Sequence, residues 1–242
     1  ALNINSSLIV YIVLPFFGFF LTLFIIPTRK ILQSNEEFKL SKELFRYNIS
    51  VAIFSVIAAF SARLDTFLNA ALLSSREVGI YGAVNQLVQI MPQLVSALGL
   101  VSSPKFASFQ NNSQMLTYFK KFQLLCSGIC LLGLLAIPLA IYLIPILFGP
   151  SYSGAIFPFI ILFLGQLIFL FSIPVHHSVI FYFGRPDVFI WVALGNVIII
   201  GGLGYLLISN FGITGAAITV FVGMIFNFIY PLGWLLVKLR RK

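Results

Sequence analysis

Seven long apolar stretches dominate the chain, separated by short breaks rich in Gly, Pro, Asn and Ser. A helix needs about 20 apolar residues to cross a bilayer core of about 30 Å at 1.5 Å per residue. No stretch alternates apolar and polar residues with a period of two, as a strand of an outer-membrane barrel would. We therefore predict about seven transmembrane helices, over residues 8–27, 49–73, 80–103, 122–148, 155–174, 188–208 and 214–237.

The composition indicates that lipid, rather than water, surrounds these helices. Apolar residues make up 60% of the 242 residues and charged residues only 9%, and the mean hydropathy is +1.05. A soluble domain of this size carries about a quarter of its residues as charged side chains. The predicted fold class is an all-α polytopic membrane protein with no soluble catalytic domain.

The net charge of +9 is distributed as a membrane topology requires. If the loop after the first helix is cytoplasmic, the inside segments hold 13 of the 15 Lys and Arg residues, in agreement with the positive-inside rule. The carboxyl terminus is then cytoplasmic, and the cations do not form the single basic face that nucleic-acid binding needs. The inside cations are Arg29, Lys30, Lys39, Lys42, Arg46, Lys105, Lys120, Lys121, Arg185, Lys238, Arg240, Arg241 and Lys242.

Two polar stretches on this inside face mix charged and apolar residues. Residues 28–48 suit a helix lying along the membrane surface, and they are either a hinge between two helical bundles or a solvated connector. Residues 105–121 predict a second interfacial elbow. The orientation puts Ala1 outside, although the segment before the first span has no signal-peptide features and position 1 is not Met. We therefore expect the chain to be the later part of a longer transporter.

The sequence offers no catalytic or metal-binding signature. It lacks the G-x-S-x-G, H-E-x-x-H, Walker and G-x-G-x-x-G motifs, so we predict neither enzymatic activity nor a cofactor. Cys126 and Cys130 lie one helical turn apart in an apolar stretch and suit packing better than a metal. His176 and His177 are adjacent, so they point to different faces, and we expect them at the membrane boundary.

Charged residues within a predicted span are the first candidates for function. Arg63 and Asp65 lie near the middle of the second span, where a charge costs about 2.5 to 3.5 kcal/mol on insertion scales and seldom faces lipid. Residues two apart differ by about 200° around a helix, so these two do not form a pair, whereas Asp65 and Asn69 share a face. The charges either line a substrate or ion pathway or are neutralised by another helix for assembly alone.

Polar residues continue along the third span. Gln86, Gln89, Gln93 and Ser96 fall on one helical face, which suits a water-filled cavity or, alternatively, hydrogen bonding between helices. Single amides elsewhere predict hydrogen bonds between helices, and four glycines in the sixth span favour close packing. The amides are Gln166, Asn196 and Asn227, and the glycines are Gly195, Gly201, Gly202 and Gly204.

Three motifs resemble one transporter family. The run RLDTFLNAALLSSREVGIYGAVNQL, the turn ILFGPSYSGA and the segment NFGITGAAITV resemble, in that order, the second lobe of polysaccharide flippases in the multidrug/oligosaccharidyl-lipid/polysaccharide exporter superfamily. The resemblance covers residues 47–242 and implies a six-helix bundle that is half of a two-lobed transporter. Residues 1–46 would then be the last helix of the first lobe and a cytoplasmic amphipathic linker.

The resemblance also implies a mechanism and a place in the cell. Such flippases carry oligosaccharide linked to polyprenyl pyrophosphate across the inner (plasma) membrane through a cavity that opens to each face in turn. Arg63 would bind phosphate, and Gln86, Gln89 and Gln93 would meet sugar hydroxyls. Asp65 and Asn69 would serve ion coupling. The first lobe, or a second copy of this chain, would supply the opposing cavity wall.

Two other functions stay open from the sequence. A drug/cation antiporter of the same superfamily would need acidic rather than basic groups in its cavity. A membrane-embedded glycan polymerase or glycosyltransferase would need catalytic carboxylates or Arg residues in a large external loop. The predicted outside loops are short.

Overall fold

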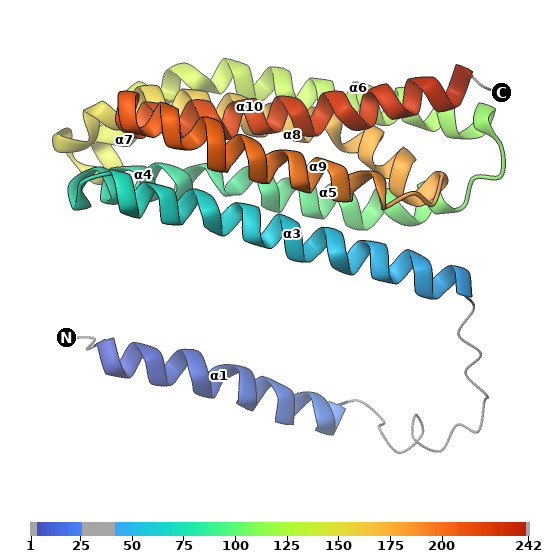
Figure 1. Ribbon diagram of the computed structural model, residues 1–242, viewed down its shortest axis with the longest axis horizontal. Coiled ribbons are helices and arrows are strands. Elements are labelled where there is room, and N and C mark those ends of the chain that lie inside the picture. Colours follow the sequence, from blue (N-terminus) through green and yellow to red (C-terminus); the bar gives the residue numbers. More distant parts are fainter. Residues whose placement is uncertain (1–3, 26–41, 241–242) are drawn as a thin grey trace. The chain divides into compact units, whose positions relative to one another are not determined.

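The computed structural model describes residues 4–25 and 42–240, and all regular elements in these ranges are helical (Figure 1). The chain divides into two compact units, Ala1–Ser41 and Lys42–Lys242. In the first unit, α1 (Ile4–Ile25) has 22 residues and spans about 33 Å, enough to cross a bilayer. Residues 28–41 of the predicted linker lie outside the described residues. Residues 42–48 belong to the next helix.

The second unit begins with α3 (Lys42–Leu72), a helix of 31 residues. It starts seven residues before the predicted boundary at 49, so residues 42–48 extend the membrane helix rather than forming a connector. Glu43 lies in its first turn, where a negative charge favours helix formation. The compact unit accordingly starts at Lys42, whereas the sequence placed the domain boundary after residue 46.

The third predicted span consists of two helices separated by one residue. Ser74 and Glu77 form a capping box that starts α4 (Ser75–Val88), and α5 (Ile90–Ala107) follows after Gln89. Pro92 explains the interruption, because proline cannot donate a backbone hydrogen bond and its ring clashes with the carbonyl group four residues earlier. That carbonyl belongs to Val88. The break divides the predicted polar stripe between α4 and α5.

The interfacial elbow predicted over 105–121 is wrong. Residues 105–107 belong to α5 and residues 112–121 to α6 (Asn112–Ala136), so only residues 108–111 link the two helices. The side-chain oxygen of Asn111 accepts a hydrogen bond from the Gln114 backbone and starts α6. The apolar side chains of this region turn into the bundle, where Phe106 and Met115 are fully buried. After α6 the short 3₁₀ helix η1 (Ile137–Leu139) leads into α7 (Ala140–Phe148).

The last part of the chain contains two π-helical turns. A 3₁₀ segment, η2 (Pro150–Ala155), precedes α8 (Ile156–His177), which continues into the π-helix η3 (Ser178–Tyr182). Next come α9 (Val188–Ile198), the π-helix η4 (Ile199–Leu203) and α10 (Gly204–Arg240). In the turn before α9, Arg185 donates two hydrogen bonds to Asp187 and thereby lowers the pKa of that carboxyl group.

Gly212 turns the last apolar run back on itself. Residues Val188–Arg240 form a run of 53 residues, about 80 Å of helix, which exceeds twice the bilayer core. Gly212 has φ 56° and ψ −135°, a conformation that glycine adopts far more readily than other residues. The chain reverses direction there (Figure 1), so the run crosses twice. With the four earlier apolar runs of this unit, the bundle has the six crossings predicted for it.

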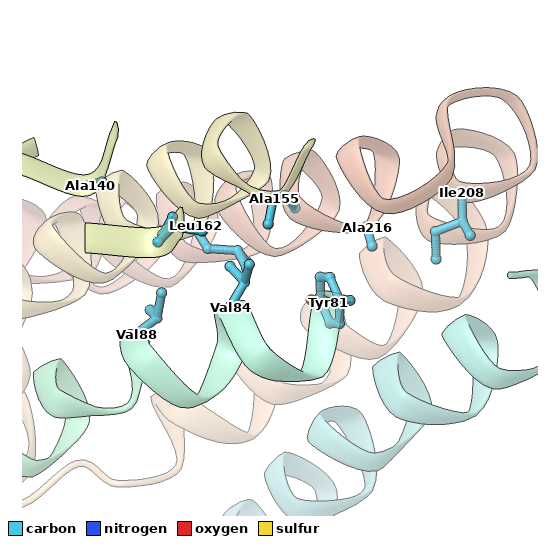
Figure 2. Close-up of a cluster of buried hydrophobic side chains, with 10 residues drawn as sticks. Tyr81, Val84, Val88, Ala140, Ala155, Leu162, Ile208 and Ala216 are labelled. Carbon is cyan, nitrogen blue, oxygen red and sulfur yellow. The ribbon is translucent and has the colours of Figure 1, made fainter. Parts of the chain in front are cut away.

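Helix α8 forms the centre of the bundle and packs against α4, α5, α6, α7 and α10. It carries twelve buried residues, more than any other described helix. Val84 and Leu162 point toward one another between α4 and α8 (Figure 2). The prediction that Gly195 allows close helix packing is confirmed: a side chain on Gly195 in α9 would overlap the ring of Phe226 in α10. Cys126 is buried and Cys130 donates to the Leu167 carbonyl oxygen, so both pack as predicted.

Four polar segments lie at one end of the second unit (Figure 1). They are the start of α3, the link between α5 and α6, the link between α8 and α9, and the end of α10. These are the described parts of the loops that the sequence assigned to the cytoplasm. Their common position agrees with one membrane face. The orientation of that face stays a prediction.

Candidate functional site

A cavity of about 520 Å³, partly open to the bundle surface, lies between α3, α4, α8, α9 and α10. Ligand pockets in proteins have volumes of about 300 to 1,000 Å³. Apolar side chains such as Phe54, Phe169 and Val192 form much of its wall. Polar side chains come from all five helices: Ser61, Asp65, Thr66, Tyr81, Asn85, Gln89, His176, Asn196 and Asn227.

The α3 and α4 wall carries a hydrogen-bonded carboxylate. Ser61 and Asp65 lie four residues apart on α3. Tyr81 and Asn85 on α4 and Gln89 at its C-terminal cap are also spaced by four, so each helix presents one face. The Tyr81 hydroxyl donates to Asp65 Oδ2 at 3.2 Å, and Asn69 Nδ2 donates to Asp65 Oδ1 at 3.2 Å. The shared face predicted for Asp65 and Asn69 is therefore present. These two bonds hold the carboxylate at the wall.

The opposite wall contains a buried histidine. His176 Nε2 lies 3.0 Å from the backbone oxygen of Asn227 on α10, so this nitrogen carries the proton that it donates. His177, on another face of α8, pairs through Nδ1 with the Ser102 hydroxyl on α5 at 2.8 Å. The two rings point apart as predicted. His176 is only 8% exposed because its ring packs between helices. The position of both residues at the membrane boundary stays a prediction.

The single amides do not join helices as the sequence predicted. Gln166 Oε1 and Asn196 Oδ1 are buried and have no hydrogen-bond partner in the described structure. Asn196 and Asn227 instead face the cavity. An unpaired buried amide oxygen costs free energy, and at Asn196 the cavity offers room for the ligand or water that would pair with it. Polar atoms that seemed suited to packing therefore belong to the site.

The structure separates the residues that the sequence proposed as one binding surface. Gln86, Gln89, Gln93 and Arg63 are all exposed, but Gln89 alone among them lines the cavity. Within the ranges that the structure describes, Arg63 forms neither a hydrogen bond nor an ion pair. The predicted polar stripe is offset by one residue from the cavity-lining face of α4. Only Gln89 belongs to both.

The cavity is suited to binding polar or cationic groups rather than to covalent chemistry. Asp65 is the only charged side chain among the lining residues, and the other polar groups are amides, hydroxyls and a histidine. The described ranges contain no group of three His, Cys, Asp or Glu residues that could hold a metal ion. Carboxylate and amide oxygens are good ligands for hard cations. Their hydrogen-bonding capacity equally suits sugar hydroxyls.

Sequence reasoning did not select Tyr81, Asn85, His176 or Asn227 as site residues. The spacing of four from Tyr81 through Asn85 to Gln89 was a usable signal, because it marks a second polar face on the same helix. No comparable signal linked His176 to Asn227. These residues lie 51 positions apart in the sequence, and only the packing of α8 against α10 brings them together.

Comparison with known proteins identifies a family. A family model described as a polysaccharide biosynthesis protein matches residues 3–157, more than half of the chain. The match includes the α3 and α4 wall of the cavity and stops before most of α8. No curated protein and no solved structure matches the chain. The resemblance found in the sequence is confirmed at the family level: the chain belongs to this polysaccharide biosynthesis protein family and is a multi-pass membrane protein.

Proposed function

We propose that the protein is a flippase that moves lipid-linked oligosaccharide or polysaccharide repeat units across the inner membrane by alternating access. The observation that supports this proposal is a cavity rich in amide and hydroxyl groups inside a membrane bundle, in a chain of a polysaccharide biosynthesis family. Polar groups in a transmembrane bundle are expensive unless they line a pathway or find partners. Carboxylate, amide and hydroxyl groups of this kind can bind a coupling cation as well as sugar hydroxyls.

We assign substrate contact and ion coupling to different places. Arg63, Gln86 and Gln93 are exposed on the bundle surface, where they would meet the pyrophosphate and the sugar of the lipid-linked substrate. Asp65 and Asn69 lie inside, joined by a hydrogen bond, where they would bind the coupling ion. Gln89 lines the cavity and forms the break between α4 and α5, so it would connect the two regions. The activity is transport, without enzymatic chemistry or a cofactor.

The exposed polar side chains need an opposing wall. Arg63 has no partner in the described residues, and an unpaired cation facing lipid is unfavourable. Alternating access as a rocking motion requires two helical bundles around a site. We propose that an N-terminal lobe, or a second copy of this chain, covers these residues and completes the transport pathway.

One observation favours a second candidate function. The charged side chain that lines the cavity is the acidic Asp65, and an acidic group is what a drug/cation antiporter of the same superfamily needs. Much of the remaining wall is aromatic or aliphatic, which would suit an organic cation. The family match to polysaccharide biosynthesis proteins makes the flippase the first candidate.

Complementation of a flippase-deficient strain by the full-length protein tests the proposal. We expect the unaltered protein to restore surface glycan and Arg63→Ala to abolish this while inserting normally, because loss of an intramembrane charge lowers the cost of insertion. Arg76→Ala is the matched control, since Arg76 is an exposed cation at the start of α4, and it should export normally. Normal export by Arg63→Ala would refute the phosphate-binding role. Resistance to cationic drugs without glycan export would establish the antiporter.

A further inference from the structure

A second hollow lies at the polar end of the bundle, away from the internal cavity. It is a groove of about 330 Å³. The last turn of α5 and the link after it form one side, and the first turns of α6 form the other. Lys105 at the end of α5 and Phe109 in the link line the first side of the groove. The other side is one face of α6, which extends as far as Lys121. No group of the proposed transport pathway lies in this groove.

The groove carries positive charge that no described side chain neutralises. Lys105 and Lys121 flank it, and no Asp or Glu occurs in the sequence between Glu77 and Asp187. Neither lysine forms an ion pair in the described ranges, and Lys105 instead lies over the Phe109 ring, 5.5 Å from its centroid. Two ammonium groups beside one groove favour an anionic ligand.

Hydrogen-bond donors line the floor of the same groove. Ser113, Gln114 and Tyr118 line it. The hydroxyls of Ser113 and Tyr118 and the side-chain amide of Gln114 have no protein partner among the described contacts. Thr117 is different, because its hydroxyl donates to the Ser113 carbonyl oxygen at 2.8 Å. The free donors can bind oxygen atoms of a ligand held between the two lysines.

Aromatic packing fixes the shape of the groove. The Tyr118 ring stacks on Phe122 with an angle of 18° between their planes, and it contacts Phe109 at 5.4 Å between centroids. Both rings also contact Phe106, which is fully buried. The Tyr118 hydroxyl is therefore held by a rigid cluster, and an apolar wall lies beside the charged rim.

We propose that this groove binds the phosphate of an anionic phospholipid headgroup. Lysine binds phosphate as a point charge, hydroxyl and amide donors complete its hydrogen bonds, and basic sites at the ends of membrane helices recognise anionic lipids. The groove lies where α5 ends and α6 begins, at the end of the bundle that the sequence assigns to the cytoplasmic membrane face. The aromatic wall accommodates the glycerol and the first acyl carbons.

Lipid binding to the purified full chain, measured by native mass spectrometry, tests this assignment. Phosphatidylglycerol and phosphatidylcholine with the same acyl chains are the two probes. We expect the first phosphatidylglycerol molecule bound per chain to bind about tenfold more tightly than the first phosphatidylcholine molecule, a ratio equivalent to about 1.4 kcal/mol. The double variant Lys105→Gln/Lys121→Gln should bind both lipids equally. Tyr118→Phe, which keeps the ring, should reduce the preference without removing it.

The matched control is the double variant Lys120→Gln/Lys238→Gln, which changes the net charge equally but leaves the groove residues intact. It should retain the tenfold preference. If both double variants lose the preference equally, diffuse surface charge explains it and the proposal is overturned. Full preference in Lys105→Gln/Lys121→Gln would also overturn the proposal. Displacement of phosphatidylglycerol by equimolar inorganic phosphate would show a free-phosphate site, and tighter binding of polyprenyl diphosphate would assign the groove to the carrier lipid. Either result would also overturn it.

Discussion

The Tyr81 hydroxyl donates a hydrogen bond to Oδ2 of Asp65 at 3.2 Å and so joins α4 to α3 across the cavity wall. This bond connects residues 16 positions apart, on the two sides of the turn at Ser74. Asn69 donates to the other carboxylate oxygen. The carboxylate of Asp65 is thus oriented by two helices, and a change in the spacing of α3 and α4 would alter its hydrogen bonds.

Two variants test the hydrogen bond to Asp65 and the charge of Asp65 separately. Tyr81→Phe keeps the buried ring and loses one hydrogen bond, so we expect a loss of stability of about 0.5 to 1.5 kcal/mol, read as a small decrease in thermal midpoint in detergent. Asp65→Asn removes the charge at almost unchanged volume, and we expect it to abolish the dependence of transport on an ion gradient. Unchanged ion dependence in Asp65→Asn would exclude Asp65 as the coupling site.

The orientation of the bundle can be tested by cysteine labelling. Ser151 lies in η2 and Gln110 in the link between α5 and α6, at opposite ends of the bundle (Figure 1), and both are exposed. With Cys126 and Cys130 replaced, Ser151→Cys should react with an impermeant thiol reagent added outside intact cells, and Gln110→Cys should react only after lysis. The reverse pattern would invert the predicted topology.

Gly212 should tolerate a side chain poorly because of its backbone conformation. Its φ of 56° and ψ of −135° form a combination that costs other residues about 1 to 3 kcal/mol, so Gly212→Ala should lower the thermal midpoint and the yield of folded protein. Gly233→Ala is the control, because Gly233 is helical and a Cβ there meets no atom within 4 Å. That variant should equal or exceed the unaltered protein in stability.

Gln166 provides a test of buried polarity away from the cavity. Its Oε1 is buried without a partner, and it does not line the cavity. Gln166→Leu, of similar volume, removes the unpaired group, so we expect a thermal midpoint that is unchanged or higher and unaltered glycan export. A marked loss of stability would show that the amide makes a bond that the structure does not contain.

The sequence predicted the membrane crossings well because each crossing requires a long apolar run, and such runs are visible residue by residue. The helix ends were less accurate. Residues 42–48 and 112–121 carry charges, yet they continue helices because polar helix ends can lie at or beyond the membrane surface. The interruption at Gln89 follows from Pro92, but its effect on the polar stripe was clear only from the structure.

The site was only partly predictable, for a physical reason. Asp65, Asn69 and Gln89 stood out because polar residues in apolar stretches are costly. Asn196, Asn227 and His176 were assigned to packing or to the boundary, since their surroundings depend on which helices meet. Contacts such as that between His176 and Asn227 arise from tertiary packing, and helical periodicity within one stretch carries no information about them.

The two π-helical turns add a property to the cavity that a bundle of uniform α-helices would lack. Ile180 in η3 and Ile200 in η4 both line the cavity, so two walls contain a turn with one residue more than the α-helical register accommodates. The surplus residue shifts the helical phase, so the side chains before and after each turn face the cavity at angles that an uninterrupted α-helix would not give. The same few residues therefore line the cavity over a wider arc than α-helical spacing allows.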